Sequence, residues 1–199
     1  NRDGSKGYGG CAYCNTDSFT PISRNLETFR EQISYSMERA AKNYGAEKFI
    51  IYFQPNTNTY APVEELKFLY DEALKINREK IVGLSVGTRP DCIDEEKIAL
   101  LESYKEQGLE VDLEMGMESI YDETLTEINR GCSHQEFVDA MNLLENSILD
   151  ICIHTILGFP NETKEMMLKY TDELNRFSKI NFVKFHHLHI VEGSILGVK

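Results

Sequence analysis

The 199-residue sequence has few basic side chains and no long apolar run. Lys and Arg number 21 against 33 Asp and Glu, which gives a formal net charge of −12. This sign disfavours a broad surface for nucleic-acid phosphates, and no local basic run offsets it. No stretch approaches the roughly 18 apolar residues that a membrane-spanning helix needs. The composition therefore predicts a soluble chain without a membrane partner, and its 41% hydrophobic residues suffice for the core of one domain.

Cysteine is scarce and unevenly placed. The five cysteines stand at positions 11, 14, 92, 132 and 152. An odd number scattered in this way does not resemble the disulfide framework of a secreted domain, so we expect a reducing, cytoplasmic location. Cys92, Cys132 and Cys152 are expected to be small, buried side chains.

The most informative motif is the CxxC pair Cys11-Ala12-Tyr13-Cys14, which follows a polar, Gly-rich segment. Two thiolates at this spacing can bind one metal ion or one edge of an iron–sulfur cluster, and a four-iron cluster needs at least one further ligand. A structural zinc site would need two more Cys or His ligands, and the sequence has no second CxxC. A thioredoxin-like pair would open a helix directly after a strand. All of these sites stay open at this point, as does an inert pair.

Strands and helices are predicted to alternate along the chain. Short apolar or β-branched runs lie at 48–53, 81–86, 111–115, 150–157 and 182–190. Amphipathic helices are expected at about 24–43, 94–107 and 163–177, after Pro62, and from a capping box that begins at Ser133. Repeated strands separated by single helices favour an α/β fold with a parallel sheet, either doubly wound or curled into part of a barrel.

The thiol pair precedes a predicted helix, but no strand precedes the thiol pair. We therefore expect the chain to start downstream of its natural beginning, with a strand in the missing part. A covering helix would also follow the last apolar run, so we expect a cut at that end as well.

Polar side chains follow every predicted strand at its carboxyl end. In parallel βα folds these ends share one rim, where binding groups gather. Because buried polar groups are costly without partners, the rim predicts a binding cavity. Its members are residues 54–59, 87–91 and 114–119, with His154, His186, His187 and His189.

In these motifs the sequence resembles the radical S-adenosylmethionine (radical SAM) superfamily. Its cluster loop ends in C-x-aromatic-C, as Cys11–Cys14 does, and segments 1–4, 9–11 and 52–60 resemble an uncharacterised bacterial subgroup. That subgroup is related to the elongator catalytic subunit and to oxygen-independent coproporphyrinogen oxidase. The resemblance implies a partial (βα) TIM-like barrel spanning 1–199, with 1–20 as the cluster-binding loop. It also places the third cluster cysteine just upstream of Asn1.

The resemblance also assigns residues to a [4Fe–4S] cluster and to S-adenosyl-L-methionine (SAM). Cys11 and Cys14 would be cluster ligands, and Tyr13 would shape the adenine side of the loop. Glu118 would meet the ribose or methionine part of SAM. Arg130, twelve residues later, would grip its carboxylate with a planar fork.

Further SAM contacts are implied on three other strands. Gln54, Asn56 and Thr57 occupy the place where relatives bind the amino group of the ligand. His154 would reach the ribose. Ile156 and Leu188 would flank the adenine, although core packing explains these two equally well. Gly87 stands where many relatives have an acidic residue, which removes one expected contact.

The implied activity is reductive cleavage of SAM to a 5′-deoxyadenosyl radical, which abstracts hydrogen from a substrate. With two thiolates instead of three, this chain is expected to bind a cluster weakly and to be inactive alone. No catalytic residue is assigned. Transfer RNA or a small molecule could be the substrate of the intact protein, and Asp91, His186, His187 and His189 are candidates to line its cavity.

Two other functions remain open at this stage. A non-enzymatic module could bind a nucleotide at the rim and zinc at the thiols. An ordinary barrel enzyme could use His187 or Glu114 as acid or base, although no compact nucleophile or paired-carboxylate motif supports it.

Overall fold

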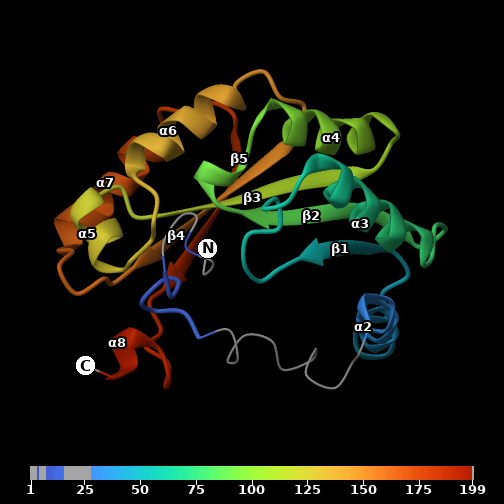
Figure 1. Cartoon of the computed structure of the whole chain (residues 1–199), viewed down its shortest axis with the longest axis horizontal. Helices are drawn as coiled ribbons and strands as arrows, with labels where there is room; N and C mark the ends of the chain where they lie inside the picture. The colour runs from blue at the N-terminus through green and yellow to red at the C-terminus, as the bar shows by residue number, and fades with distance from the viewer. Residues whose placement is uncertain (1–3, 5–7, 16–27, 199) are drawn as a thin grey trace.

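The computed structural model describes residues 4, 8–15 and 28–198, and a sheet of five parallel strands forms its centre (Figure 1). The spatial order of the strands follows their order along the chain. This arrangement confirms the predicted α/β class with a parallel sheet. The strands are β1 (Phe49–Phe53), β2 (Ile81–Thr88), β3 (Glu110–Glu118), β4 (Asp150–Leu157) and β5 (Ile180–His187).

Most helices follow a strand and cover one face of the sheet, whereas the first helix precedes β1 and is drawn below that strand (Figure 1). The helices that contribute buried side chains to its core are α2 (Phe29–Tyr44), α3 (Val63–Lys75), α4 (Glu95–Glu106), α6 (His134–Leu143) and α7 (Lys164–Leu174). Three shorter elements are η2 (Pro90–Cys92), α5 (Asp122–Glu127) and α8 (Ile195–Val198). Among the described residues, no helix combines the length and apolar character that crossing a membrane requires.

The two faces of the sheet differ in chemistry because successive side chains of a strand point to opposite faces. Leu84, Val86, Leu113 and Met115 belong to the helix-covered face and are fully buried. Polar positions alternate with them, and the parallel register aligns these positions across the sheet. Tyr52 pairs with Ser85, Glu114 with Cys152, and His154 with Lys184. The uncovered face is therefore polar at its centre.

Most predicted elements agree with the structure, and the largest differences lie at element ends. The predicted capping box is confirmed, since Ser133 Oγ accepts from the backbone N–H of Glu136 and the Glu136 carboxylate accepts from the N–H of Ser133. The last strand ends at His187 rather than at 190. Its neighbour β4 ends at Leu157, whose carbonyl accepts from Leu188 N, so no partner strand continues beyond. The helix predicted at 24–43 is Phe29–Tyr44, and residues 24–27 lie outside the described residues.

Candidate functional site

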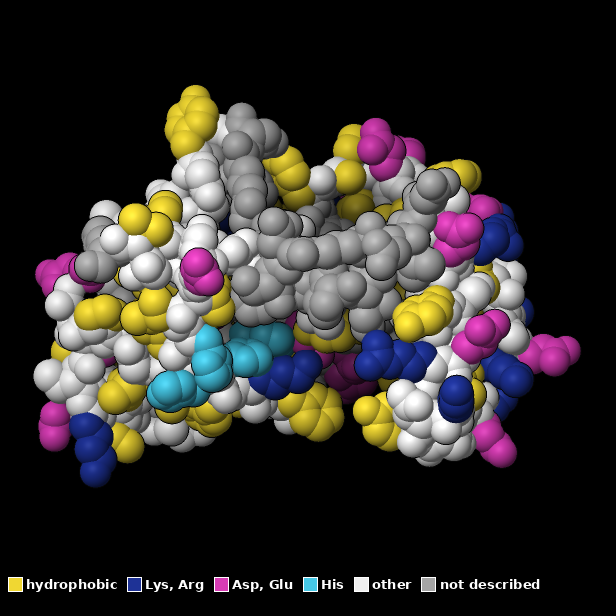
Figure 2. Space-filling model, turned by 90° about the horizontal axis from the view of Figure 1, so that it is seen from below, with side chains coloured by type: hydrophobic (Ala, Val, Ile, Leu, Met, Phe, Trp, Pro, Cys, Tyr) yellow, Lys and Arg dark blue, Asp and Glu magenta, His cyan; other side chains and the backbone are white. Residues whose placement is uncertain are grey.

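A cavity of about 730 Å³ opens over the polar face and the carboxyl ends of the strands. Figure 2 shows this side of the molecule, where histidine side chains gather beside basic and acidic groups. Every residue predicted to contact the cofactors lines the cavity except Leu188. The predicted residues at its wall are Cys11, Tyr13, Cys14, Gln54, Asn56, Thr57, Glu118, Arg130, His154 and Ile156.

The thiol loop is held in place by backbone hydrogen bonds to distant parts of the chain. Cys14 N donates to Cys11 O at 2.9 Å, which closes a turn around the pair. Ala12 N donates to Ile128 O at 2.7 Å, and Leu196 N donates to Ala12 O at 2.9 Å. The connection after α5 and the last helix therefore fix both sulfur-bearing residues at the mouth of the cavity.

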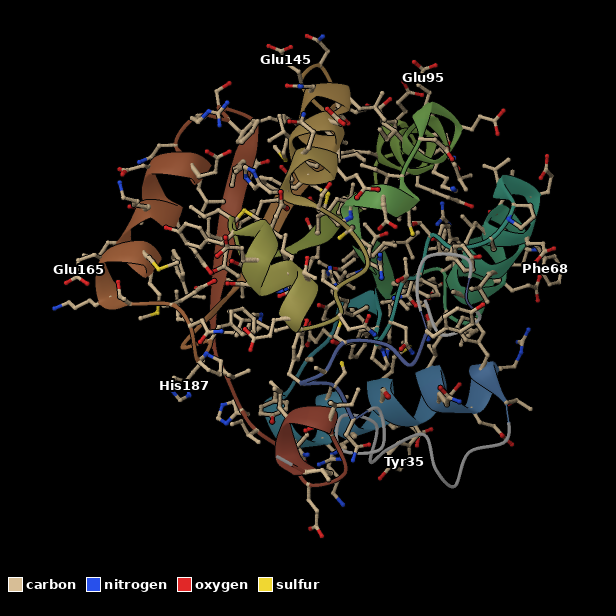
Figure 3. The ribbon with its side chains drawn as sticks, turned by 60° about the vertical axis from the view of Figure 1, so that its left-hand side comes forward. Tyr35, Phe68, Glu95, Glu145, Glu165 and His187 are labelled. Atoms are coloured by element: carbon tan, nitrogen blue, oxygen red, sulfur yellow. The ribbon has the colours of Figure 1, made fainter. Side chains whose placement is uncertain are left out.

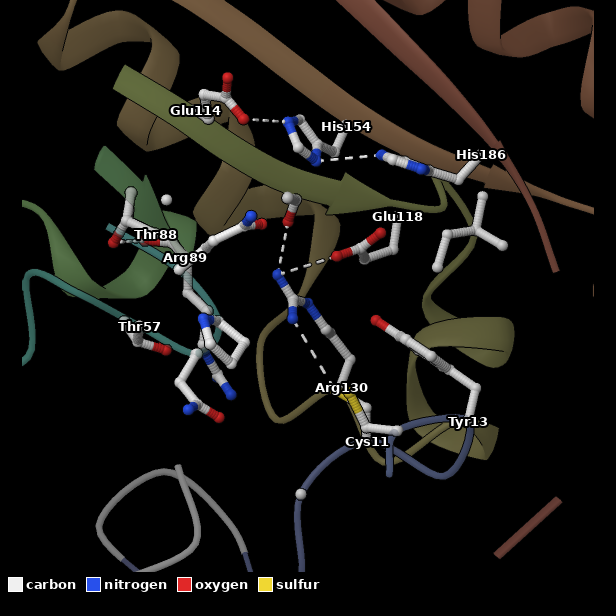
Figure 4. A pocket seen from close by; sticks show the side chains of 18 of the residues that line it. Cys11, Tyr13, Thr57, Thr88, Arg89, Glu114, Glu118, Arg130, His154 and His186 are labelled. Atoms are coloured by element: carbon white, nitrogen blue, oxygen red, sulfur yellow. Dashed lines mark hydrogen bonds and ion pairs between the residues drawn. The ribbon is translucent and has the colours of Figure 1, made fainter. Parts of the chain in front are cut away.

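Arg130 and Glu118 meet beside the thiol loop (Figure 4). Arg130 Nη2 lies 3.5 Å from Glu118 Oε1 and donates to Gly116 O at 2.7 Å, while Nη1 lies 3.7 Å from Cys11 Sγ. Nε of Arg130 is buried and has no hydrogen-bond partner among the described residues. A guanidinium with one N–H still unpaired can donate a hydrogen bond to an anionic ligand at this end of the cavity.

The end of β3 is shaped to bring this pair together. The register with β4 shifts between Gly116 and Glu118, and Glu118 adopts a φ of 65° in the left-handed region. A Cβ on Gly116 would lie 2.5 Å from Glu118 Oε1 and 2.7 Å from Arg130 Nη2. Any larger residue would require the ends of these two side chains to shift. A strained residue in a cavity wall is typical of a functional position.

An apolar wall continues from the thiol loop. Leu125, Ile128, Ile156 and Phe159 form a small buried cluster, against which Tyr13 and Leu188 pack. The ring centroids of Tyr13 and Phe159 are 6.1 Å apart. Leu188 therefore supports the wall from behind, and its predicted contact with adenine stays a prediction.

A buried ion pair supports the loop that carries Arg130. Arg89 donates from Nε and Nη2 to the two carboxylate oxygens of Asp91 at 2.8 and 3.0 Å, and from Nη2 to Gly131 O at 2.8 Å. The Asp91 side chain is 1% exposed. Asp91 does not line the cavity, whereas Arg89 does. The position of Asp91 indicates that it supports the cavity wall from behind, whereas the sequence predicted that it lines a substrate cavity.

The opposite end of the cavity is organised around Glu114 in the middle of β3. Its carboxylate accepts hydrogen bonds from Tyr52, Ser85, His154 and Lys184, with 3.2 Å to Ser85 Oγ and 2.8 Å to His154 Nε2. Burial alone would raise the pKa of Glu114, but the hydrogen bonds from His154, Lys184 and Tyr52 outweigh it and lower the pKa to about 2. The group is therefore ionised at neutral pH and is a poor proton donor.

His154 and His186 extend this network toward the cavity. His186 Nε2 lies 3.2 Å from His154 Nδ1, so both ring nitrogens of His154 are engaged. A contact of His154 with a ribose stays a prediction and would compete with these bonds. His186 lines the cavity, as predicted for a substrate-facing residue, but His187 and His189 do not. Figure 3 shows His187 at the periphery of the molecule, pointing away from the sheet.

The loop after β1 closes one side of the cavity. The amide of Asn58 donates to Phe53 O at 2.8 Å and to Gly87 O at 3.0 Å, which fixes the loop to the end of β2. Gln54 and Asn56 are exposed and Thr57 is half-buried. Their side chains are therefore available to a ligand.

The remaining three cysteines do not line the cavity. Cys92 and Cys152 are buried, as predicted, while Cys132 is half-buried. Burial raises the pKa of the Cys132 and Cys152 thiols to about 11. Thiol, imidazole and carboxylate atoms of Cys152, His154 and Glu114 lie within 4.8 Å of one another. Because Lys184 already neutralises the carboxylate and the thiol stays protonated, we assign no metal ion to this group.

Comparison with known proteins identifies a matching protein family and several proteins of related sequence. A family model described as "Radical SAM superfamily" matches residues 8–174. Protein YhcC of Escherichia coli strain K12 is 37% identical over 197 residues, which cover 99% of this chain and 62% of that protein. A tRNA uridine(34) acetyltransferase of Methanocaldococcus infernus is 32% identical over 136 residues, covering 63% of this chain and 24% of the relative. The chain thus spans less than two thirds of the length of these relatives.

Solved structures agree with these matches. Archaeal Elp3 of Methanocaldococcus infernus, with its N-terminus deleted, superposes with a TM-score of 0.70 at 25% identity, over 84% of this chain and 43% of that one. Coproporphyrinogen III oxidase (HemN) of Escherichia coli gives 0.61 at 16% identity, over 94% of this chain and 43% of that one. The second likeness shows a shared fold, in agreement with the predicted partial barrel.

Proposed function

Because this chain belongs to the radical SAM superfamily, as the sequence resemblance predicted, we propose that it forms the part of an enzyme that holds a [4Fe–4S] cluster and SAM. These are the cofactors of the family. One observation carries the proposal for this chain. The thiol of Cys11 lies 3.7 Å from Arg130 Nη1, so the sulfur donors and a buried cation share one wall of the cavity.

The residues present fit part of a cluster site. Cys11 and Cys14 face the cavity from one anchored turn, and the other three cysteines do not line it. A cluster ligated by three thiolates therefore needs one donor that the described residues do not supply. We expect residues 1–199 alone to bind iron weakly and to show little activity.

The chain's own side chains would bind and orient SAM. The unpaired Nε of Arg130 and its guanidinium fork suit the carboxylate of the ligand, and Glu118 suits its ribose or amino group. Gln54, Asn56 and Thr57 offer polar contacts from the loop after β1. Ile156 and Tyr13 offer an apolar surface that suits adenine and excludes water. When bound, the cofactors would supply the radical chemistry.

For the intact protein we propose transfer RNA or a small molecule as the substrate. Relatives with tRNA-directed names support transfer RNA, whereas the net charge of −12 argues that these residues contribute little phosphate binding. A small molecule fits the cavity as well. We expect a cytoplasmic enzyme of oxidoreductase or transferase type.

Anaerobic reconstitution tests the proposal on the protein that the full gene encodes. Iron, sulfide and SAM binding are measured for the wild type, for the double variant Cys11→Ser/Cys14→Ser and for Cys132→Ser as a matched thiol control. We expect the double variant to lose nearly all iron and the control to keep it. Equal iron in all three proteins contradicts the proposal, as does one tightly bound zinc without iron, which would instead indicate a zinc-binding module.

A further inference from the structure

A continuous chain of hydrogen bonds crosses three neighbouring strands at the floor of the cavity. It runs from Glu114 on β3 through His154 on β4 to His186 on β5 (Figure 4). The register of the sheet sets this order, because His154 pairs with Lys184 and Ile156 with His186. None of the cofactor roles proposed above uses Glu114 or His186.

The chemistry of the three side chains determines which of them donates and which accepts in each hydrogen bond. The Glu114 carboxylate can only accept hydrogen bonds, so Nε2 of His154 must donate to it across 2.8 Å. Nδ1 of a neutral His154 is then an acceptor, and the partner 3.2 Å away, Nε2 of His186, must be its donor. This assigns the Nε2–H tautomer to both rings. Nδ1 of His186 keeps its lone pair and has no hydrogen-bond partner among the described residues.

The surroundings keep Glu114, at one end of this hydrogen-bond chain, ionised, and His186, at the other end, neutral. Lys184 and Tyr52 also donate to Glu114, and the Lys184 ammonium lies 5.2 Å from the Tyr52 ring centroid. Partial burial and the neighbouring His154 and Lys184 lower the pKa of His186, against the opposing charges of Glu118 and Glu114. His186 is therefore mainly the free base at neutral pH.

We propose that Glu114, His154 and His186 form a proton relay whose cavity end, Nδ1 of His186, exchanges a proton with the substrate. This role rests on the proposed function, because the substrate would occupy the cavity beside SAM. The group it serves is a weakly acidic O–H or N–H of the substrate. His186 would be a catalytic residue, and Glu114 and His154 would be positioning residues.

The proposed step is acid–base chemistry alone. The substrate O–H or N–H bond breaks, its electron pair stays on the substrate atom, and a new N–H bond forms at Nδ1 of His186. The proton on Nε2 of His186 then passes to Nδ1 of His154, which leaves His186 neutral in its other tautomer. His154 becomes an imidazolium that pairs with the Glu114 carboxylate. No electron leaves or enters the system.

Acylation with diethylpyrocarbonate, followed residue by residue with mass spectrometry, tests the relay without cofactors or substrate. The probe reacts with unprotonated imidazole nitrogens, and the exposed His187 and His189 serve as internal controls. We expect His186 to be acylated, because its Nδ1 keeps a lone pair, and His154 to react more slowly than either control, because both of its ring nitrogens are engaged. Acylation of His154 as fast as that of the two controls would overturn the proposal.

A nitrogen-15 NMR measurement on histidine-labelled protein provides the second readout. We expect the Nε2–H tautomer for both His154 and His186, and a changed nitrogen-15 shift of His154 Nε2 in Glu114→Gln, while His187→Gln leaves that shift unchanged. An Nδ1–H tautomer for His186, or a His154 Nε2 shift that is the same in Glu114→Gln as in the wild type, refutes the relay. If Glu114→Gln does not fold, the tautomers of the wild type still decide. Iron loading is independent of these results, so the relay and the proposed function can fail separately.

Discussion

The two ends of the cavity are built in different ways. At the thiol end, Cys11, Tyr13 and Arg130 lie on loops that distant hydrogen bonds hold in place. At the opposite end, Tyr52, Glu114, His154 and Lys184 project from inside strands, and the register of the sheet brings them together. The thiol end therefore depends on loop contacts that single substitutions can remove. The Glu114 end is part of the sheet and shares the stability of the sheet.

The largest effect is expected from Asp91→Asn, which breaks the anchor of the thiol end. Removing one partner of a buried ion pair costs about 3–5 kcal/mol, because the other charge stays buried and uncompensated. The unfolding free energy from urea denaturation should fall accordingly, and hydrogen exchange should rise near Gly131, whose carbonyl accepts from Arg89. Asp139→Asn, at an exposed position, is the control and should change little. A loss below about 1 kcal/mol would contradict the anchoring role.

Acid should weaken the Glu114 end selectively. The pKa of Glu114 in the folded chain is lowered to about 2 from an ordinary value of 4.5. The carboxylate therefore contributes stability that is complete above pH 4.5 and is lost as the pH falls toward 2, at most about 3 kcal/mol. Urea denaturation from pH 7 to pH 3 measures the slope. A wild-type slope equal to that of Glu114→Gln would show that the carboxylate is not stabilised.

At neutral pH, Glu114→Gln should remove the charge that Lys184 and His154 share. We expect a loss of about 2 kcal/mol, since these donors lose a charged acceptor while the amide keeps the shape of the side chain. The exposed Glu95→Gln should be neutral in the same assay. Hydrogen exchange at the thiol loop should stay at its wild-type rate, because its anchors lie at the other end. Faster exchange there would mean that the two ends are coupled.

Gly116→Ala tests the close packing between Glu118 and Arg130. The added methyl group would approach both side chains to less than 3 Å, so they must separate. We expect a loss of about 1–2 kcal/mol in stability and weaker SAM binding by calorimetry. Unchanged SAM affinity alongside reduced stability would remove the pair from the proposed ligand site.

The smallest effect is expected from Asn129→Gly. The Asn129 amide donates to Tyr8 O at 2.7 Å and Gly10 O at 2.8 Å, and the residue has a φ of 52° that glycine also adopts. The substitution therefore removes the two bonds without backbone strain, at a cost of about 1 kcal/mol. Limited proteolysis should cut the thiol loop faster, with little change in melting temperature. Protection equal to the wild type would show that other anchors suffice.

The sequence predicted the thiol end better than the Glu114 end for a physical reason. Cys11, Cys14 and Arg130 belong to local motifs with fixed spacing, which can be recognised without knowing the fold. The union of Glu114, His154 and Lys184 depends on strand register, and one residue of slip would point them to the other face. Their alternation with buried apolar positions was visible, but the partners across the sheet were not. Helix α5 was missed because six residues are too few for a clear helical period.

The bond between Leu196 N and Ala12 O joins the first described segment of the chain to the last helix. A contact so distant in sequence forms late, because a long loop must close before it gains anything from the contact. During synthesis on the ribosome, the two sulfur atoms would therefore remain outside their final setting until α8 has emerged. We expect the delivery of inorganic iron and sulfide to follow translation of this region rather than to accompany it.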